Sequence, residues 1–228
     1  MDSCLDRAYE HCAASASHYE NFPVGSFLLP REKRRHVCAL YAFMRTADDF
    51  ADEPEHAGSR REKLDKWQTR LESAASCDPG GGADDMVFAA LSETVKKHDI
   101  PAALLKDMLT AFRMDTEKDR YADFEELLSY CRYSANPVGR IMLMLFGYRD
   151  EKLMRLSDMI CTALQLTNHW QDVPEDLDRN RVYLPLADMK EAGYGPEELA
   201  GRKYTPAFRR LMEIEIDRTR ALFVEGGE

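Results

Sequence analysis

Apolar residues recur along most of this chain at intervals of three and four positions, the spacing that places side chains on one face of an α-helix. Clusters of Pro and Gly separate these stretches and mark their ends. The pattern predicts helices over residues 5–19, 31–52, 60–75, 84–98, 101–115, 124–133, 137–146, 151–176 and 206–224. No stretch shows the convincing alternation of a half-buried strand, so we expect an all-α fold.

Two regions of the pattern bear on the architecture. Residues 124–146 form one predicted helix that is interrupted near Asn136-Pro137, because proline cannot donate the helical hydrogen bond. The stretch 151–176 is apolar on most sides in its first half, which is typical of a central helix. Neither an internal repeat nor a long linker is apparent, so we expect a single domain over residues 1–228.

The composition excludes several classes of protein. The 228 residues include 31 Lys and Arg against 41 Asp and Glu, a net charge of −10, whereas a nucleic-acid binder needs clustered basic residues. Six cysteines without a CxxC pair indicate reduced thiols. The longest apolar run, residues 141–146, is too short to cross a bilayer, and the first residues do not resemble a signal peptide. We therefore expect a cytoplasmic location, with peripheral contact to a membrane left open.

One predicted helix has acidic residues where an amphipathic helix should bury its face. Tyr41, Arg45, Asp48 and Asp52 follow one another at intervals of four, three and four residues. Because this spacing matches the helical turn, all four side chains share one face.

A second stripe of polar residues lies in the predicted central helix. Gln165, Asn168, Asp172 and Asp176 are spaced by three, four and four residues, so this helix also presents its polar groups along a line. Pro174 falls inside the segment and removes one helical hydrogen bond. We expect it to kink the chain between Asp172 and Asp176.

The two stripes predict a metal-dependent reaction. Carboxylates stacked one turn apart repel each other, so a cation should lie between them. Oxygen ligands without an accompanying row of Cys or His favour Mg²⁺, which keeps several waters and is completed by phosphate oxygens of a substrate. The chemistry that needs two such stripes is the ionisation of a diphosphate ester, in which Mg²⁺ stabilises the charge that grows as the carbon–oxygen bond breaks.

A solvated surface or a di-iron centre accounts less well for the acidic stripes. An acidic cluster on one helix is most often a solvated face, but two matched stripes on otherwise apolar helices favour a site. A di-iron carboxylate bundle needs Glu-x-x-His on each of two helices. The chain offers that spacing only at Glu53 and His56, beside Pro54 in a predicted loop, so a di-iron centre fails on ligand type.

Both stripes lie within longer phrases, which are DDFAD at residues 48–52 and NHWQDVPED at residues 168–176, followed by RVYLP at residues 181–185. Other distinctive phrases are SHYENFPV at 17–24, LP at 29–30, YAFMRTAD at 41–48 and YCRYSANPVG at 130–139. Together they resemble the squalene/phytoene synthase family over nearly the whole chain. The resemblance is greatest to the hydroxysqualene synthase branch of bacterial hopanoid-type squalene formation.

This resemblance implies an isoprenoid synthase fold, an all-α bundle around a central cavity with Mg²⁺ at its mouth. It implies that Mg²⁺ is held by Asp48, Asp52, Asn168, Asp172 and Asp176. It implies that the substrate and its diphosphate contact His18, Phe22, Tyr41, Arg45, Gln165, Asn168, Arg181 and Tyr183. The residues expected to take part in catalysis are Tyr41, Arg45, Asp48, Asp52 and Asp172. Members of the family usually continue through further C-terminal helices, which we expect this chain to lack.

The resemblance also implies a reaction. Enzymes of this branch take presqualene diphosphate, ionise it as carbon–oxygen lyases, rearrange the cyclopropylcarbinyl cation and let water capture it to give hydroxysqualene. No nicotinamide is then needed, in agreement with the absence of a Gly-rich dinucleotide motif. Two alternatives stay open: head-to-head condensation of two farnesyl or geranylgeranyl diphosphates, and an inactive helical partner subunit.

A carbocation with long prenyl tails needs apolar and aromatic walls that exclude water. Candidates for such walls, for which core packing is the simpler interpretation, are Phe22, Phe27, Phe43, Tyr133, Met142, Leu145, Phe146 and Leu164. Gly139 would allow close approach of either a ligand or a second helix. We expect Trp67 and Trp170 to be structural.

Overall fold

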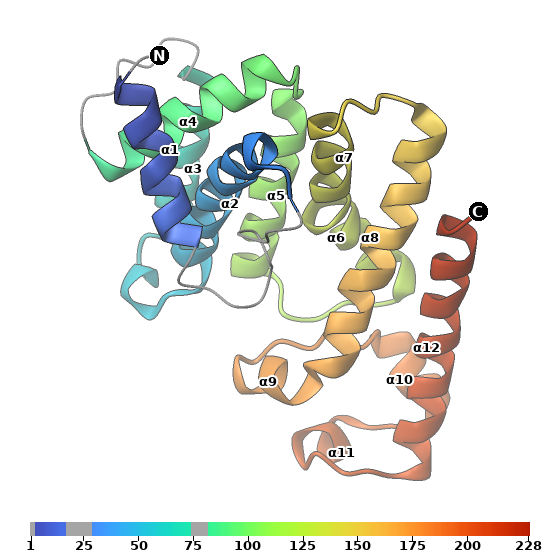
Figure 1. The fold of residues 1–228 in the computed structure, drawn as a ribbon. Coiled ribbons are helices and arrows are strands. Elements are labelled where there is room, and N and C mark those ends of the chain that lie inside the picture. The colour runs from blue at the N-terminus through green and yellow to red at the C-terminus, as the bar shows by residue number, and fades with distance from the viewer. Residues whose placement is uncertain (1–2, 17–28, 74–81) are drawn as a thin grey trace. The chain divides into compact units, whose positions relative to one another are not determined.

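Helices make up the regular structure of the chain (Figure 1). The computed structural model describes residues 3–16, 29–73 and 82–228. Within these ranges there is no strand, and the isolated β-bridge found there joins Arg120 and Val182. The all-α prediction is therefore confirmed for the part of the chain that the structure describes.

The longer helices begin and end close to the positions that the apolar pattern predicts. They are α1 Ser3–Ala16, α2 Arg31–Asp52, α3 Arg60–Ser73, α4 Ala83–Lys97, α5 Ala102–Glu117, α6 Phe124–Ser134, α7 Asn136–Leu145, α8 Glu151–Gln171 and α12 Pro206–Gly226. Shorter helices are η1 Pro54–His56, α9 Val173–Asp178, α10 Leu186–Ala192 and α11 Pro196–Ala200. The contacts divide the chain into an amino-terminal unit, Met1–Arg113 with Ile141–Arg149, and a carboxy-terminal unit, Met114–Arg140 with Asp150–Glu228.

An aromatic cluster forms the core of the amino-terminal unit, where α1, α2 and α4 lie against one another and α3 packs on α2 (Figure 1). The Trp67 ring from α3 lies 5.7 Å from Phe43 of α2 and 4.5 Å from Phe88 of α4, measured between ring centroids. Its indole nitrogen donates a hydrogen bond of 3.3 Å to the Phe43 carbonyl. All three side chains are buried, so this cluster joins three helices through contacts of high packing density.

In the carboxy-terminal unit, α8 runs alongside α12 and also contacts α6, while α10 packs on α12 (Figure 1). Trp170 of α8 is buried and its indole nitrogen donates to Thr219 Oγ1 of α12 at 2.9 Å. The structural role expected for Trp67 and Trp170 is confirmed by these buried hydrogen bonds.

Gly139 serves helix packing. A Cβ atom at this position of α7 would lie against Ser157 Oγ and Cys161 Sγ of α8, closer than van der Waals contact allows. The two helices therefore approach each other closely because residue 139 has no side chain.

The predicted helix over residues 151–176 is wrong in one respect. Helix α8 ends at Gln171, Asp172 has the non-helical dihedrals φ −96° and ψ 15°, and α9 begins at Val173. Pro174 occupies the first turn of α9, where its missing N–H costs no hydrogen bond. The kink expected at Pro174 thus becomes a break between two helices.

The wall candidates fall into different environments. Phe43 and Leu145 are fully buried, whereas Phe146 and Leu164 are 42% and 51% exposed. Phe43 is accounted for by the aromatic cluster, as the core-packing interpretation predicts. Phe22 and Phe27 lie outside the described residues. No helix among the described residues is long and apolar enough to span a membrane.

Candidate active site

The first acidic stripe lies on α2 and is held together by an arginine. Arg45 Nη1 lies 2.8 Å from Asp48 Oδ2, and Arg45 Nη2 lies 2.7 Å from Asp49 Oδ1. All of the predicted residues of this stripe, Tyr41 and Asp52 included, are half-buried. One guanidinium therefore orients two carboxylates at the end of α2 and offsets part of their mutual repulsion.

Asp49 is a residue that the spacing of the stripe does not select. It follows Arg45 by four positions, the i,i+4 relation in which opposite charges meet on a helix, and that relation is its sequence signal. Together with Arg45 and Thr46 it borders a cavity of about 350 Å³ in the amino-terminal unit. The other described residues that line this cavity are His11, Ser15, Ala42, Ala83, Asp84 and Val87.

The second stripe continues across the break between α8 and α9. The Asp172 N–H donates to the Asn168 carbonyl, and the Asp176 N–H donates to the Asp172 carbonyl, each at 2.8 Å. The i,i+4 register from residue 168 to residue 176 is therefore kept despite Pro174. Asn168 and Asp172 are exposed, while Gln165 is half-buried with its Nε2 3.3 Å from Nε2 of His169.

Asp176 has an unsatisfied carboxylate oxygen. Its Oδ2 atom is buried and has no hydrogen-bond partner among the described residues. Burial and the nearby charge of Asp172 raise the pKa of Asp176 to about 6, although Arg181 and Arg179 oppose the shift. A cation at this oxygen would relieve both the missing hydrogen bond and the repulsion from Asp172.

A small cavity lies beside Asp176 in the carboxy-terminal unit. Its volume of about 10 Å³ is close to the space that one water molecule requires. The residues that line it are His169, Val173, Asp176, Arg181, Val182, Tyr183, Leu184 and Leu199. Arg181 and Tyr183, both predicted from the sequence to contact substrate, are thus brought together with Asp176.

An aromatic cluster surrounds Tyr183. The His169 ring stacks on the Tyr183 ring at 3.7 Å between centroids. Tyr183 and Tyr130 both donate hydrogen bonds from their hydroxyl groups to Asp115, at 3.4 Å and 3.1 Å. Burial is the main cause that raises the pKa of both tyrosines and lowers the pKa of His169 to about 3. The tyrosines therefore stay protonated and the histidine uncharged at neutral pH.

Asp115, Tyr130 and His169 are not selected by either acidic stripe. Tyr130 and Tyr183 meet at Asp115 through separations of 15 and 68 residues, and the longer one has no local pattern. Tyr130 is the first residue of the phrase YCRYSANPVG, and this phrase is the sequence feature that points to Tyr130 as a site residue.

The predicted Mg²⁺ ligands fall into two groups, with Asp48 and Asp52 in the amino-terminal unit and Asn168, Asp172 and Asp176 in the carboxy-terminal unit. Among the described residues, no three His, Cys, Asp or Glu side chains lie close enough together to hold a metal ion. The metal site and the central cavity between the two stripes stay predictions. His18 and Phe22, two of the predicted substrate contacts, lie outside the described residues.

The chain is similar in sequence to a known enzyme family from residue 15 to residue 228, the range that matches the family model described as squalene/phytoene synthase. The chain belongs to the squalene/phytoene synthase family. The resemblance seen in its two aspartate-rich phrases is thereby confirmed.

Solved structures of this family have the same fold. The squalene synthase HpnC from Alicyclobacillus acidocaldarius is 41% identical with a TM-score of 0.88, over 97% of this chain and 82% of that one. A dehydrosqualene synthase in complex with a ligand is 26% identical with a TM-score of 0.85, over 97% of this chain and 76% of that one.

Plant phytoene synthases are similar in sequence as well. The chloroplastic phytoene synthase of an Oncidium hybrid cultivar is 35% identical over 97% of this chain, and phytoene synthase 2 of Solanum lycopersicum is 34% identical over the same share. This family member spans 54% of the length of the Oncidium enzyme and 72% of the length of the tomato enzyme.

Proposed function

We propose that this member of the squalene/phytoene synthase family ionises a prenyl diphosphate with the help of Mg²⁺, and that it converts presqualene diphosphate to hydroxysqualene. The observation that carries the proposal is the buried, unpartnered Oδ2 of Asp176, which lies next to Asp172 in the second aspartate-rich motif. A carboxylate in this condition fits a divalent cation as its partner.

The residues that would hold Mg²⁺ are Asp48, Asp52, Asn168, Asp172 and Asp176, all with oxygen ligands of the kind that this ion prefers. When bound, Mg²⁺ would neutralise the diphosphate and stabilise the charge on the leaving group. Arg45 would orient the metal ligand Asp48, because its guanidinium pairs with both Asp48 and Asp49 and fixes the directions in which they point.

The cluster around Tyr183 contains no tyrosinate at neutral pH. Because Tyr130 and Tyr183 keep their protons and direct them to Asp115, neither hydroxyl acts as a tyrosinate base at neutral pH. The uncharged His169 ring covers one face of Tyr183.

The higher identity to the squalene synthase HpnC, 41% against 35% for the Oncidium phytoene synthase, favours a squalene-type substrate. Head-to-head condensation of two prenyl diphosphates is the second candidate, because the curated relatives include many phytoene synthases. An inactive partner subunit is the third.

Product analysis separates these candidates. Purified protein is incubated with Mg²⁺ and either presqualene, farnesyl or geranylgeranyl diphosphate, and the products are identified by mass spectrometry. We expect hydroxysqualene and free diphosphate from presqualene diphosphate. A condensed product from farnesyl or geranylgeranyl diphosphate, with presqualene diphosphate left intact, would support the second candidate. If no substrate releases diphosphate, the result would support the third candidate, an inactive partner subunit.

A binding measurement tests the same site without catalysis. Mg²⁺ together with inorganic diphosphate should raise the melting temperature by roughly 5–10 °C when the ligand is present at 100 times its Kd. Differential scanning fluorimetry with Mg²⁺ alone and diphosphate alone provides the controls. An equal shift with diphosphate alone would contradict the requirement for the metal.

A further inference from the structure

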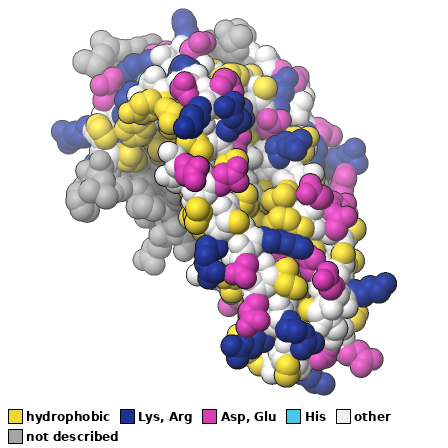
Figure 2. Space-filling model, turned by 90° about the vertical axis from the view of Figure 1, so that its right-hand side faces the viewer, with side chains coloured by type: hydrophobic (Ala, Val, Ile, Leu, Met, Phe, Trp, Pro, Cys, Tyr) yellow, Lys and Arg dark blue, Asp and Glu magenta, His cyan; other side chains and the backbone are white. Residues whose placement is uncertain are grey.

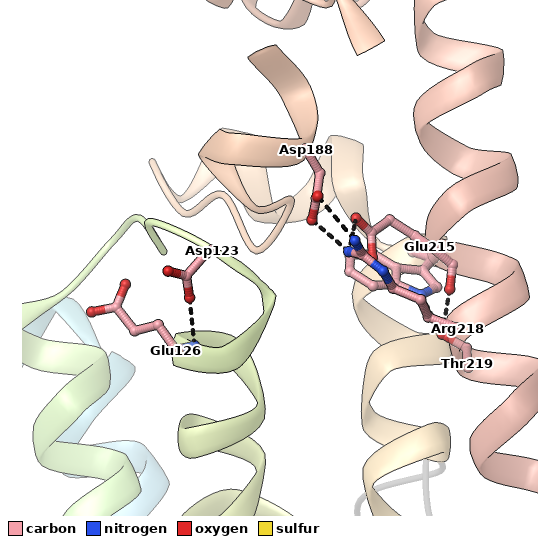
Figure 3. Close-up of polar contacts among 7 residues, drawn as sticks. Asp123, Glu126, Asp188, Glu215, Arg218 and Thr219 are labelled. Carbon is pink, nitrogen blue, oxygen red and sulfur yellow. Dashed lines mark hydrogen bonds and ion pairs between the residues drawn. The ribbon is translucent and has the colours of Figure 1, made fainter. Parts of the chain in front are cut away.

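Two carboxyl groups meet in the interior of the carboxy-terminal unit, away from both acidic stripes. Asp188 lies in the first turn of α10, and Glu215 lies in the middle of α12 (Figure 3). Their residues are 6% and 0% exposed. We call them the buried carboxyl pair. Since no residue of this pair belongs to an aspartate-rich motif, the proposed reaction gives no reason for two acids to be buried together.

One guanidinium faces the buried carboxyl pair. Arg218 forms a two-pronged ion pair with Asp188, with Nη1 2.6 Å from Oδ2 and Nη2 3.2 Å from Oδ1 (Figure 3). Its Nη1 atom is 3.5 Å from Glu215 Oε1, a much weaker contact. The geometry thus assigns the positive charge of Arg218 mainly to Asp188.

The second oxygen of Glu215 has no compensation of this kind. Its Oε2 atom is buried and has no hydrogen-bond partner among the described residues. A buried carboxylate without a partner is strongly unfavourable, and a group in that position usually takes up a proton instead. A protonated Glu215 can donate to the carboxylate of Asp188 and satisfy the pair.

The neighbouring helices add little positive charge. The Phe124 ring of α6 covers the Arg218 guanidinium. Asp123, the N-cap of α6, and Glu126 have other partners and lie apart from the pair (Figure 3). On α10, Glu191 contributes a further negative charge near Arg218.

On α8, the indole nitrogen of Trp170 donates a hydrogen bond to Thr219. The adjacent His169 is uncharged because burial lowers its pKa to about 3. The groups described on α6, α8 and α10 therefore do not compensate a second negative charge on the buried carboxyl pair.

The pKa of Glu215 agrees with this lack of a compensating positive charge. Burial raises the pKa of Glu215 to about 8, and the neighbouring Asp188 acts in the same direction, against the opposing effect of Arg218.

We infer that Asp188 and Glu215 share a single proton at neutral pH, and that this proton fastens α12 to α10 as a pH-dependent latch. The proton lies between the two carboxyl groups, and Arg218 balances the remaining negative charge. Loss of the proton places two carboxylates against each other in a buried site, and their repulsion opposes the contact between the helices.

The direction of the pH effect follows from linkage. Glu215 has a pKa near 4.5 when unfolded and about 8 when folded, so the folded state binds the extra proton between these values. The stabilising effect of this proton is complete below pH 4.5 and is lost as the pH rises through about 8. Between the two values the equilibrium constant for folding should fall by up to about tenfold for each pH unit, and the fall should level off above the folded-state pKa.

Thermal unfolding of the whole chain across this pH range tests the latch. The melting temperature of the wild type should fall as the pH rises from about 4.5 to about 8. Glu215→Gln, which carries a permanent neutral donor, should make that fall smaller. Glu213→Gln is the matched control on α12, because Glu213 is exposed and pairs with Arg209 at the surface. A pH profile of Glu215→Gln that equals the wild type would overturn the inference.

A second measurement does not depend on a folded variant. The infrared carbonyl stretch of a protonated carboxylic acid should be present in the wild type at neutral pH and should disappear as the pH passes about 8. In Glu213→Gln this band should persist at neutral pH. If the wild type shows no protonated carboxyl band at neutral pH, the shared proton is refuted whatever the stability of Glu215→Gln.

Discussion

Asp172→Asn should lower the rate of diphosphate release from presqualene diphosphate by about 10²–10³-fold, an effect typical of removing one electrostatic stabiliser of a developing charge. The substitution keeps the shape of the side chain and replaces a charged ligand by a neutral amide. It also removes the negative charge that raises the pKa of Asp176. The measurement is the rate of diphosphate release under saturating Mg²⁺, accompanied by the melting temperature of the free protein.

Asp178→Asn provides the control for this prediction. Asp178 lies on α9 within a few residues of the motif, but its partner is Arg202 at the surface, so its loss should leave the rate nearly unchanged. Asp48→Asn should reproduce the effect of Asp172→Asn if both motifs serve one reaction. A rate for Asp172→Asn within a few-fold of the wild type would remove the second motif from the mechanism.

Trp67→Ala should lower the free energy of unfolding by about 3–5 kcal/mol, the usual range for removing a buried aromatic side chain. The side chain is only 2% exposed and joins α2, α3 and α4 through its contacts with Phe43 and Phe88. The substitution leaves a cavity and removes the donor to the Phe43 carbonyl. This loss is a large part of the roughly 5–15 kcal/mol by which a domain is typically stable.

Urea unfolding followed by circular dichroism measures this change. Tyr148→Ala is a suitable control because Tyr148 belongs to the same unit and is 53% exposed, so its loss should cost less than about 0.5 kcal/mol. If Trp67→Ala lowers the free energy of unfolding no more than Tyr148→Ala does, the cluster of Phe43, Trp67 and Phe88 is not the core of the amino-terminal unit.

The sequence predicts the helices because most of them have one apolar face that packs on a neighbour. Helix α2 illustrates this, since Pro30 and Pro54 bound it and most of its apolar positions are buried. The end of α8 could not be placed as well, because the apolar and polar positions continue in register through Asp172. Helices α10 and α11 span seven and five residues, too few for a 3.6-residue period to appear.

The site was predictable where its members lie along one helix face. The stripe of Arg45, Asp48 and Asp52 depends only on local spacing. The ion pairs of Arg45 are likewise local, because they join it to residues three and four positions further along the same helix. The meeting of Tyr130 and Tyr183 at Asp115 depends instead on how the later parts of the chain return to the end of α5, which no local period records.

The net charge of −10 has a more even distribution than the two motifs alone suggest. Arg45 pairs with Asp48 and Asp49, and Arg202 pairs with Asp178. On the face shown in Figure 2, acidic and basic side chains are interspersed, with apolar side chains between them. The unpaired acid is therefore local, and Asp176 is the clearest example.

The two tryptophans of the chain are divided between its two units, with Trp67 in one and Trp170 in the other. Each indole is buried and makes its own hydrogen bond, so each should emit at short wavelength while its unit is folded and shift to longer wavelength when water reaches it. Trp67→Phe and Trp170→Phe would each retain a single tryptophan, whose emission can be excited selectively. The intrinsic fluorescence of these two proteins thus gives a separate optical record of the opening of each unit, without any attached dye.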